Sequence, residues 1–256
     1  MDYHFFARLI IISMGIMSER LILLDVWRGC IILAMIFYHL MWNLGYFNFV
    51  DFRINRLEGW LIFKNIIITN FVFIAGISTH ILANSPFFYK KVFYRVGLLF
   101  LAAALVTVFG YIGRPSSPIY MGILHFFALA TLLVIPVARH RLSCILLAMT
   151  IFTVSYIREY PNFNGTDFCF TSLEESCHKT SDFVPLFPWL GVLLMGVVLA
   201  PLFLNCFKRF APKQKIAGIP LVSWLGRHSL SIYLIHAPLL FVAIGQLNKL
   251  IEEFVA

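Results

Sequence analysis

The chain contains seven segments of about 20 mostly apolar residues, and a helix of that length can cross a lipid bilayer. The segments are Leu23–Leu44, Trp60–Leu82, Val96–Ile112, Ile119–Val137, Leu142–Ile157, Phe187–Phe207 and Ser229–Leu247. Their apolar residues do not fall at every second position, as they would in the strands of a lipid-facing barrel. The pattern therefore predicts an all-α fold, a polytopic membrane helix bundle of about seven spans.

The composition excludes several classes of protein. Hydrophobic residues make up 61% of the 256 residues and charged residues 12%, whereas soluble domains are about 45–50% apolar and about 25% charged. This balance excludes an ordinary cytosolic enzyme and a disordered chain. The net charge of +8 would suggest nucleic acid as a partner in a soluble chain, but in a membrane protein Lys and Arg collect in cytoplasmic loops. We therefore expect no nucleic-acid partner, and one membrane domain over residues 1–256.

The basic residues predict how the chain is oriented. With seven spans, thirteen of the 20 Lys and Arg residues lie on the side of the N-terminus and the remaining seven on the other side. Positively charged loops stay in the cytoplasm, so we expect the N-terminus inside and the C-terminus outside. The segment Phe5–Met17 is too short to span and lacks a basic n-region and a cleavage site, which argues against a signal peptide. We expect an interfacial helix within residues 1–19, although Met17 also reads as a natural start.

The longest loop, residues 158–182, lies outside in this topology and carries Cys169 and Cys177. A disulfide between them is predicted for an oxidising compartment, and two reduced surface thiols are the alternative. The two cysteines lack a second Cys or His pair at zinc-binding spacing, so we expect no metal.

The first span carries four polar residues, Asp25, Arg28, His39 and Asn43, which share one helical face. The eleven residues from Arg28 to His39 turn the helix by about 1100°, within about 20° of whole turns, and raise it by roughly 16 Å. Ionisable residues inside a membrane are costly and point to function. Asp25 and Arg28 can pair at i, i+3, and the pair could equally anchor the helix at the inner interface.

Two histidines are expected at a similar depth on different spans. His39 lies some six residues below the outer end of the first span, and His125 about 9 Å inside the outer end of the fourth. Imidazole suits proton transfer because its unperturbed pKa of about 6.5 lies near the working pH. Either histidine could instead be a hydrogen-bonded packing residue.

The inner mouth of the last span carries Arg227 and His228, with His236 deeper in the same helix. Together with Arg28 they could form a basic rim that binds a phosphorylated ligand. Ordinary positive-inside bias and contact with lipid headgroups are the alternative. Asp182, before the sixth span, could cap that helix or bind a substrate that faces outward.

Several blocks together resemble a known family. They are RLILLDVWRG at residues 20–29 followed by Met35 and His39, FVFIAGIS at 71–78, GILH at 122–125, the stretch from Asp182 to Gly191, and LGRHSLSIYLIH at 225–236. In this order they are similar to the catalytic domain of heparan-alpha-glucosaminide N-acetyltransferase, in its short bacterial branch. The resemblance implies transfer of an acetyl group from cytoplasmic acetyl-CoA to an acceptor beyond the membrane, in the prototype a glucosamine amine.

The chain also departs from that prototype, which is longer, with more spans and a luminal domain. The prototype has Asn where His39 falls, and its active His lies in the following loop, whereas Tyr46–Leu57 contains no His here. The catalytic His of the prototype therefore does not transfer to this chain by position.

The residues and the resemblance together predict a bacterial inner-membrane acyltransferase. We assign its expected side chains to four roles: catalytic His39, His125 and Asn43; acetyl-CoA-binding Arg28, Arg227 and His228; substrate-binding Asp182 and His236; and structural Asp25. His39 would act as a base or carry the acyl group. The expected partners are membrane lipid and a sugar-like acceptor, and a homodimer is left open. The alternatives are a proton-coupled transporter and a membrane protein without chemistry.

Overall fold

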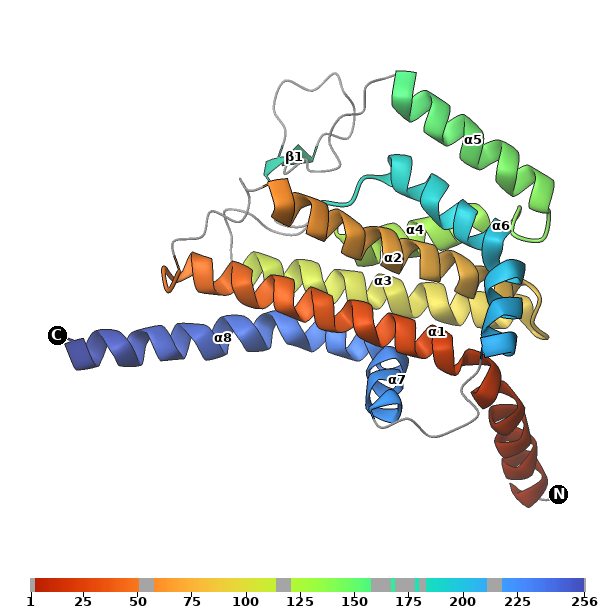
Figure 1. Cartoon of the computed structure of the whole chain (residues 1–256), viewed down its shortest axis with the longest axis horizontal. Helices are drawn as coiled ribbons and strands as arrows, with labels where there is room; N and C mark the ends of the chain where they lie inside the picture. Colours follow the sequence, from red (N-terminus) through yellow and green to blue (C-terminus); the bar gives the residue numbers. More distant parts are fainter. Residues whose placement is uncertain are drawn as a thin grey trace. The chain divides into compact units, whose positions relative to one another are not determined.

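A computed structural model describes residues 3–50, 58–113, 121–157, 167–168, 178–179, 183–210 and 218–255. The described residues form eight helices and one short two-stranded ribbon (Figure 1). The elements are α1 (Tyr3–Tyr46), α2 (Glu58–Ala83), α3 (Phe88–Gly113), α4 (Ile123–Val134), α5 (Arg141–Ile157), β1 (Asp167–Phe168), β2 (His178–Lys179), α6 (Leu186–Phe210), α7 (Ile219–Arg227) and α8 (Ser229–Val255). The predicted helical membrane bundle is confirmed.

Five of the helices are long and apolar enough to cross a membrane, namely α1, α2, α3, α6 and α8. The two other predicted spans correspond to the shorter apolar helices α4 and α5. The segment Phe5–Met17 is helical, as expected, but it is continuous with the first span in α1. Its predicted position at the membrane interface stays a prediction.

The chain folds into two compact units, and the prediction of a single domain stays a prediction. Unit 1 comprises residues 1–54 and 201–256, and unit 2 comprises residues 55–200. Unit 1 contains α1, α7, α8 and the part of α6 that begins at Pro201. Unit 2 contains α2 to α5 and the first part of α6.

In unit 1, α7 packs closely on the first third of the span in α1. A Cβ atom at Gly226 would collide with the backbone carbonyl oxygen of Asp25, and one at Gly29 with that of Val222. Small residues of this kind allow helix backbones in a membrane to approach. Because both contacts are made through backbone atoms, α7 is held at the level of Asp25 and Arg28, near the N-terminal end of the span in α1.

In unit 2, α4 connects the two ends of the helix group although it has only 12 residues. At one end, the backbone N–H of Val184 donates to the carbonyl of Met121 at 2.9 Å. At the other end, Nε of Arg139 donates to the carbonyl of Ala83 at 2.9 Å, and its guanidinium lies 4.6 Å from the centre of the Phe88 ring. The 12 residues of α4 rise by about 18 Å, less than the hydrocarbon thickness of a bilayer, and turns beyond the end of the helix lead the chain on to Arg139.

Helices α2 and α6 approach each other through a pair of glycines, also in unit 2. A Cβ at Gly76 would collide with the carbonyl of Leu193, and one at Gly196 with the carbonyl of Phe73. The close approach again follows the small-residue rule for membrane helices.

Large apolar side chains cover much of the outer surface of the helices. Tyr94 on α3 is 75% exposed, Tyr156 on α5 is 86% exposed and Phe254 on α8 is 89% exposed. Water would disfavour so much exposed apolar surface, whereas lipid tails accommodate it. The surface thus agrees with a multi-pass membrane protein.

The predicted outer loop of residues 158–182 is described only at its short ribbon, where Phe168 pairs with His178 and Asp167 with Lys179. One residue beyond the first pair, the sequence reaches Cys169 on one side and Cys177 on the other. Both cysteines lie outside the described residues, as does Asp182. Their disulfide therefore stays a prediction.

Candidate active site

The N-terminal part of the polar stripe on α1, which the sequence predicts to be its inner part, is an ion pair in unit 1. Nη1 of Arg28 donates to Oδ1 of Asp25 at 3.1 Å, and the two side chains are 25% and 17% exposed. Arg227, at the end of α7, lies close enough to Asp25 to interact electrostatically with its carboxylate. Three of the predicted residues thus form one charged group, which we call the inner cluster: Asp25, Arg28 and Arg227.

His228 lies next to this cluster, between α7 and α8. Its Nδ1 donates to the carbonyl oxygen of Trp224 at 2.9 Å, and its ring lies on the indole with centroids 4.5 Å apart. Ser229 then begins α8, and the first turn of a helix carries backbone N–H groups without intrahelical acceptors and the positive end of the helix dipole. The neighbourhood is therefore favourable for an anion.

Farther along α1, the structure brings His39 against His236 of α8. The centres of the two imidazoles are 4.9 Å apart and their planes meet at 64°. Nδ1 of His236 faces two carbonyl oxygens, that of Tyr233 at 2.7 Å and that of Ile232 at 3.2 Å. Carbonyl oxygens only accept, so Nδ1 carries the proton of the neutral ring and Nε2 is left as the basic nitrogen.

Asn43 completes this second group, and we call His39, Asn43 and His236 the imidazole cluster. The side chain of Asn43 is 3% exposed, and its Nδ2 donates to the carbonyl of His39 at 2.7 Å. Its Oδ1 is buried and has no hydrogen-bond partner among the described residues. A buried acceptor without a donor costs free energy, and such atoms often mark the position of a ligand group.

His125, the other predicted catalytic histidine, belongs to unit 2. Its Nε2 lies 3.2 Å from Oγ1 of Thr107 on α3, and the ring is partly buried. The alternative for His125 was a hydrogen-bonded packing residue, and Thr107 is the hydrogen-bond partner that this role requires. Its predicted convergence with His39 stays a prediction.

Two apolar residues separate the inner cluster from the imidazole cluster along α1. Ile32 falls on the same helical face as the polar stripe and is 0% exposed, and Met35 nearby is 4% exposed. A side chain without accessible surface borders no opening as large as a water molecule. The polar stripe from Arg28 to His39 is thus interrupted at Ile32, where no such opening borders it.

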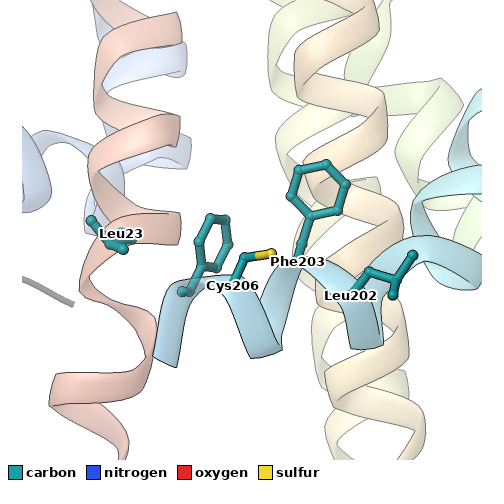
Figure 2. Close-up of a pocket in the computed structure, with 5 residues that line it drawn as sticks. Leu23, Leu202, Phe203 and Cys206 are labelled. Carbon is teal, nitrogen blue, oxygen red and sulfur yellow. The ribbon is translucent and has the colours of Figure 1, made fainter. Parts of the chain in front are cut away.

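A cavity of about 340 Å³ lies on the opposite face of α1, in unit 1. Figure 2 shows Leu23 of α1 together with Phe203 and Cys206 of α6, and Leu202 and Phe207 complete the lining. The lining offers neither Arg28 nor Arg227, so this cavity does not fit the phosphates of a nucleotide.

Two features of the site were not predicted from the sequence. The helix α7 was not expected as a separate element, although Gly218 and Pro220 do mark its start. Trp224 has no predicted role either, yet it lies four residues before His228, which is the spacing of neighbours on a helix surface. Among the residues that the structure describes, no three His, Cys, Asp or Glu side chains cluster as metal ligands.

The fold and these two clusters define a polytopic helical membrane protein with ionisable side chains inside its helix bundle. Residues 20–238 match the family model of the catalytic domain of heparan-alpha-glucosaminide N-acetyltransferase, and the chain belongs to this family. The match crosses both units in one stretch. The comparison with curated proteins gave no match, and neither did the comparison with solved structures. The chain is thus a membrane protein of an acetyltransferase family.

Proposed function

We propose that this protein transfers an acetyl group from cytoplasmic acetyl-CoA to an amine or hydroxyl of a sugar-like acceptor on the far side of a bacterial inner membrane. The observation that carries the proposal is the imidazole cluster, in which His39 contacts His236 beside a buried acceptor atom of Asn43. Imidazole groups of this kind can take a proton from an attacking nucleophile. The chain that carries them belongs to an acetyltransferase family.

The inner cluster fits the phosphate groups of CoA. Arg227 and His228 are exposed and Arg28 is partly exposed, so all three side chains can be reached at the inner end of the span. Guanidinium groups bind phosphate through short charge-assisted hydrogen bonds, and the first turn of α8 adds backbone donors. Asp25 holds Arg28 in place through their ion pair, which is the structural role expected for it.

The chemistry is assigned to the imidazole cluster. The acceptor nitrogen or oxygen attacks the thioester carbon; the new C–N or C–O bond forms and the C–S bond breaks. His39 takes the proton that the acceptor loses and passes it to the leaving thiolate, so charge and atoms balance. Oδ1 of Asn43 accepts a hydrogen bond from the acceptor, and Nε2 of His236 accepts another. His125 keeps its proposed catalytic role, and Asp182 its proposed role in binding the acceptor.

Transfer between the two clusters requires motion in the core. The thioester arm has to pass Ile32 and Met35, and Ile32 has no accessible surface in this structure. Met is unbranched and flexible and can repack at low cost, whereas Ile is stiff at its β-branched carbon. We therefore propose that a rearrangement around these two side chains accompanies acyl transfer.

The proposed orientation predicts the location of the C-terminus. Fused to the C-terminus, alkaline phosphatase is expected to be active and green fluorescent protein dark. Alkaline phosphatase becomes active only in the periplasm, whereas green fluorescent protein becomes fluorescent only in the cytoplasm. The same reporters fused after Asn84, in the connection between α2 and α3, are expected to show the reverse. A fluorescent C-terminal fusion would contradict the orientation.

Native mass spectrometry of the purified protein tests two further proposals. These are that the protein binds membrane lipid, and that it forms a homodimer.

Binding of CoA is the direct test of the enzyme against the carrier alternative. CoA is expected to raise the thermal unfolding midpoint of the purified protein, and Arg227→Ala to weaken CoA binding by roughly ten- to a hundredfold, because a hydrogen bond to a charged group contributes about 1.5–3 kcal/mol. Arg209→Ala, an exposed arginine at the end of α6, removes the same charge outside the site and serves as the control. Solute uptake without any stabilisation by CoA would instead support a carrier.

A further inference from the structure

Helix α7 presents two different faces. Gly226 is buried against Asp25 of α1, whereas Leu221, Trp224, Arg227 and His228 are all exposed. Positions separated by three, four and seven residues follow one stripe along a helix. The indole and the imidazole thus lie on the face of α7 that points away from α1, and Arg227 lies beside this face, toward Asp25 of α1, with which it interacts.

Trp224 and His228 lie on each other on this face and form a preorganised aromatic pair, which we call the platform. Their ring centroids are 4.5 Å apart with an angle of 35°, and the hydrogen bond from Nδ1 of His228 to the Trp224 carbonyl fixes the imidazole in place. The Trp224 side chain nevertheless remains 48% exposed, so part of the indole is open to a ligand. Arg227, three residues after Trp224, lies at the edge of the platform.

The uncovered face of the indole, beside a guanidinium, is suited to a nucleotide. Purine bases stack on indole and imidazole rings, and arginine binds the phosphates attached to the ribose. A lipid tail would use the apolar surface of Trp224 but not the fixed imidazole or the cation. The close contact between Gly226 and Asp25 places this platform at the level of the inner cluster, where the proposed phosphate-binding residues lie.

We propose that the exposed face of α7 is the adenine subsite for CoA, in which the base stacks on the uncovered face of Trp224, His228 supports the indole from its other face, and Arg227 binds the adjacent phosphates. The proposal rests on acetyl-CoA being the acyl donor and assigns a residue, Trp224, that the proposed function does not use. CoA then lies with its nucleotide at α7 and its pantetheine arm directed along the polar face of α1.

The test compares three probes by calorimetry on the purified full chain. Trp224→Ala is expected to weaken binding of CoA and of adenosine 3′,5′-bisphosphate by about tenfold, since stacking of a base on an aromatic side chain contributes about 1–3 kcal/mol. Binding of 4′-phosphopantetheine, which lacks the adenine, is expected to stay unchanged. Trp224→Phe keeps an aromatic face and should bind CoA within about threefold of the native chain. Leu221→Ala, one turn earlier on the same face, is the control and should leave all three affinities unchanged.

The outcomes separate this inference from the proposed function. If the native chain binds no CoA, the proposed function fails and the adenine subsite with it. If the native chain binds CoA and Trp224→Ala binds it equally well, only the subsite is refuted and Trp224 is a lipid-facing anchor. Trp224→Leu keeps the apolar bulk without the aromatic face, so a native-like CoA affinity in that variant refutes the subsite even if the alanine variant does not fold.

Discussion

His39→Ala is expected to lower the rate of acetyl transfer by about a hundredfold to ten-thousandfold, which is the usual contribution of a general acid–base group. The ring of His39 contacts that of His236 in unit 1 and is partly exposed, so the variant loses the proposed base beside the acceptor. The measurement uses proteoliposomes with labelled acetyl-CoA and an amino sugar, and expression and unfolding midpoint are recorded for the same preparation.

The control for this variant is His140→Ala. His140 is an exposed histidine in the connection between α4 and α5, so its replacement removes an imidazole without touching the imidazole cluster. His140→Ala is expected to retain the native rate. A His39→Ala protein with full activity would remove His39 from the mechanism, and His236 would then be the remaining base in the cluster.

Gly226→Ala is expected to destabilise unit 1 strongly, although it adds only one methyl group. The added Cβ would overlap the backbone carbonyl oxygen of Asp25, and a backbone atom cannot move away by changing rotamer. We expect a loss of about 1–3 kcal/mol in unfolding free energy, as for overpacked cores, and a fall of roughly 2–12 °C in the unfolding midpoint. Binding of CoA should be lost as well, because Arg227 and Arg28 would no longer be held together.

Gly97→Ala provides the matched control. Gly97 lies in α3, and nothing lies within 4 Å of the position that its Cβ would occupy. Alanine is the better helix former by about 1 kcal/mol, so this variant should be as stable as the native chain or slightly more stable. Equal unfolding midpoints for the two alanine variants would show that α7 is not packed on α1 as described.

The helices could be predicted from the sequence because a bilayer selects apolar segments of nearly fixed length. The length of α4 was overestimated, since its apolar run continues to Val137 whereas the helix ends at Val134. Pro136 explains the difference: Ile135 before it still has helical geometry, but proline lacks the N–H that would continue the helix. The partner of α1 was not predictable, because the contacts of Gly29 and Gly226 with facing backbone are made between residues almost 200 positions apart.

The site was predictable only in part. Helical periodicity predicts that Asp25, Arg28, His39 and Asn43 share a face, and in the structure the inner and imidazole clusters lie on it against α7 and α8. Periodicity does not reveal which side chains fill the gap between the clusters, so the buried Ile32 was not foreseen. Nor does it reveal that His236 meets His39, since the relative height of two helices depends on how their ends are connected.

The most direct test of the account separates the two substrates by a membrane. The purified protein is reconstituted into vesicles with glucosamine trapped inside, and labelled acetyl-CoA, which does not cross the bilayer, is added outside. The account predicts that labelled N-acetylated sugar accumulates in the lumen, and only in vesicles that contain the protein. If intact vesicles transfer no label to trapped amino sugars, and transfer appears only when both substrates share one side, the proposed acetyl transfer across the membrane is contradicted.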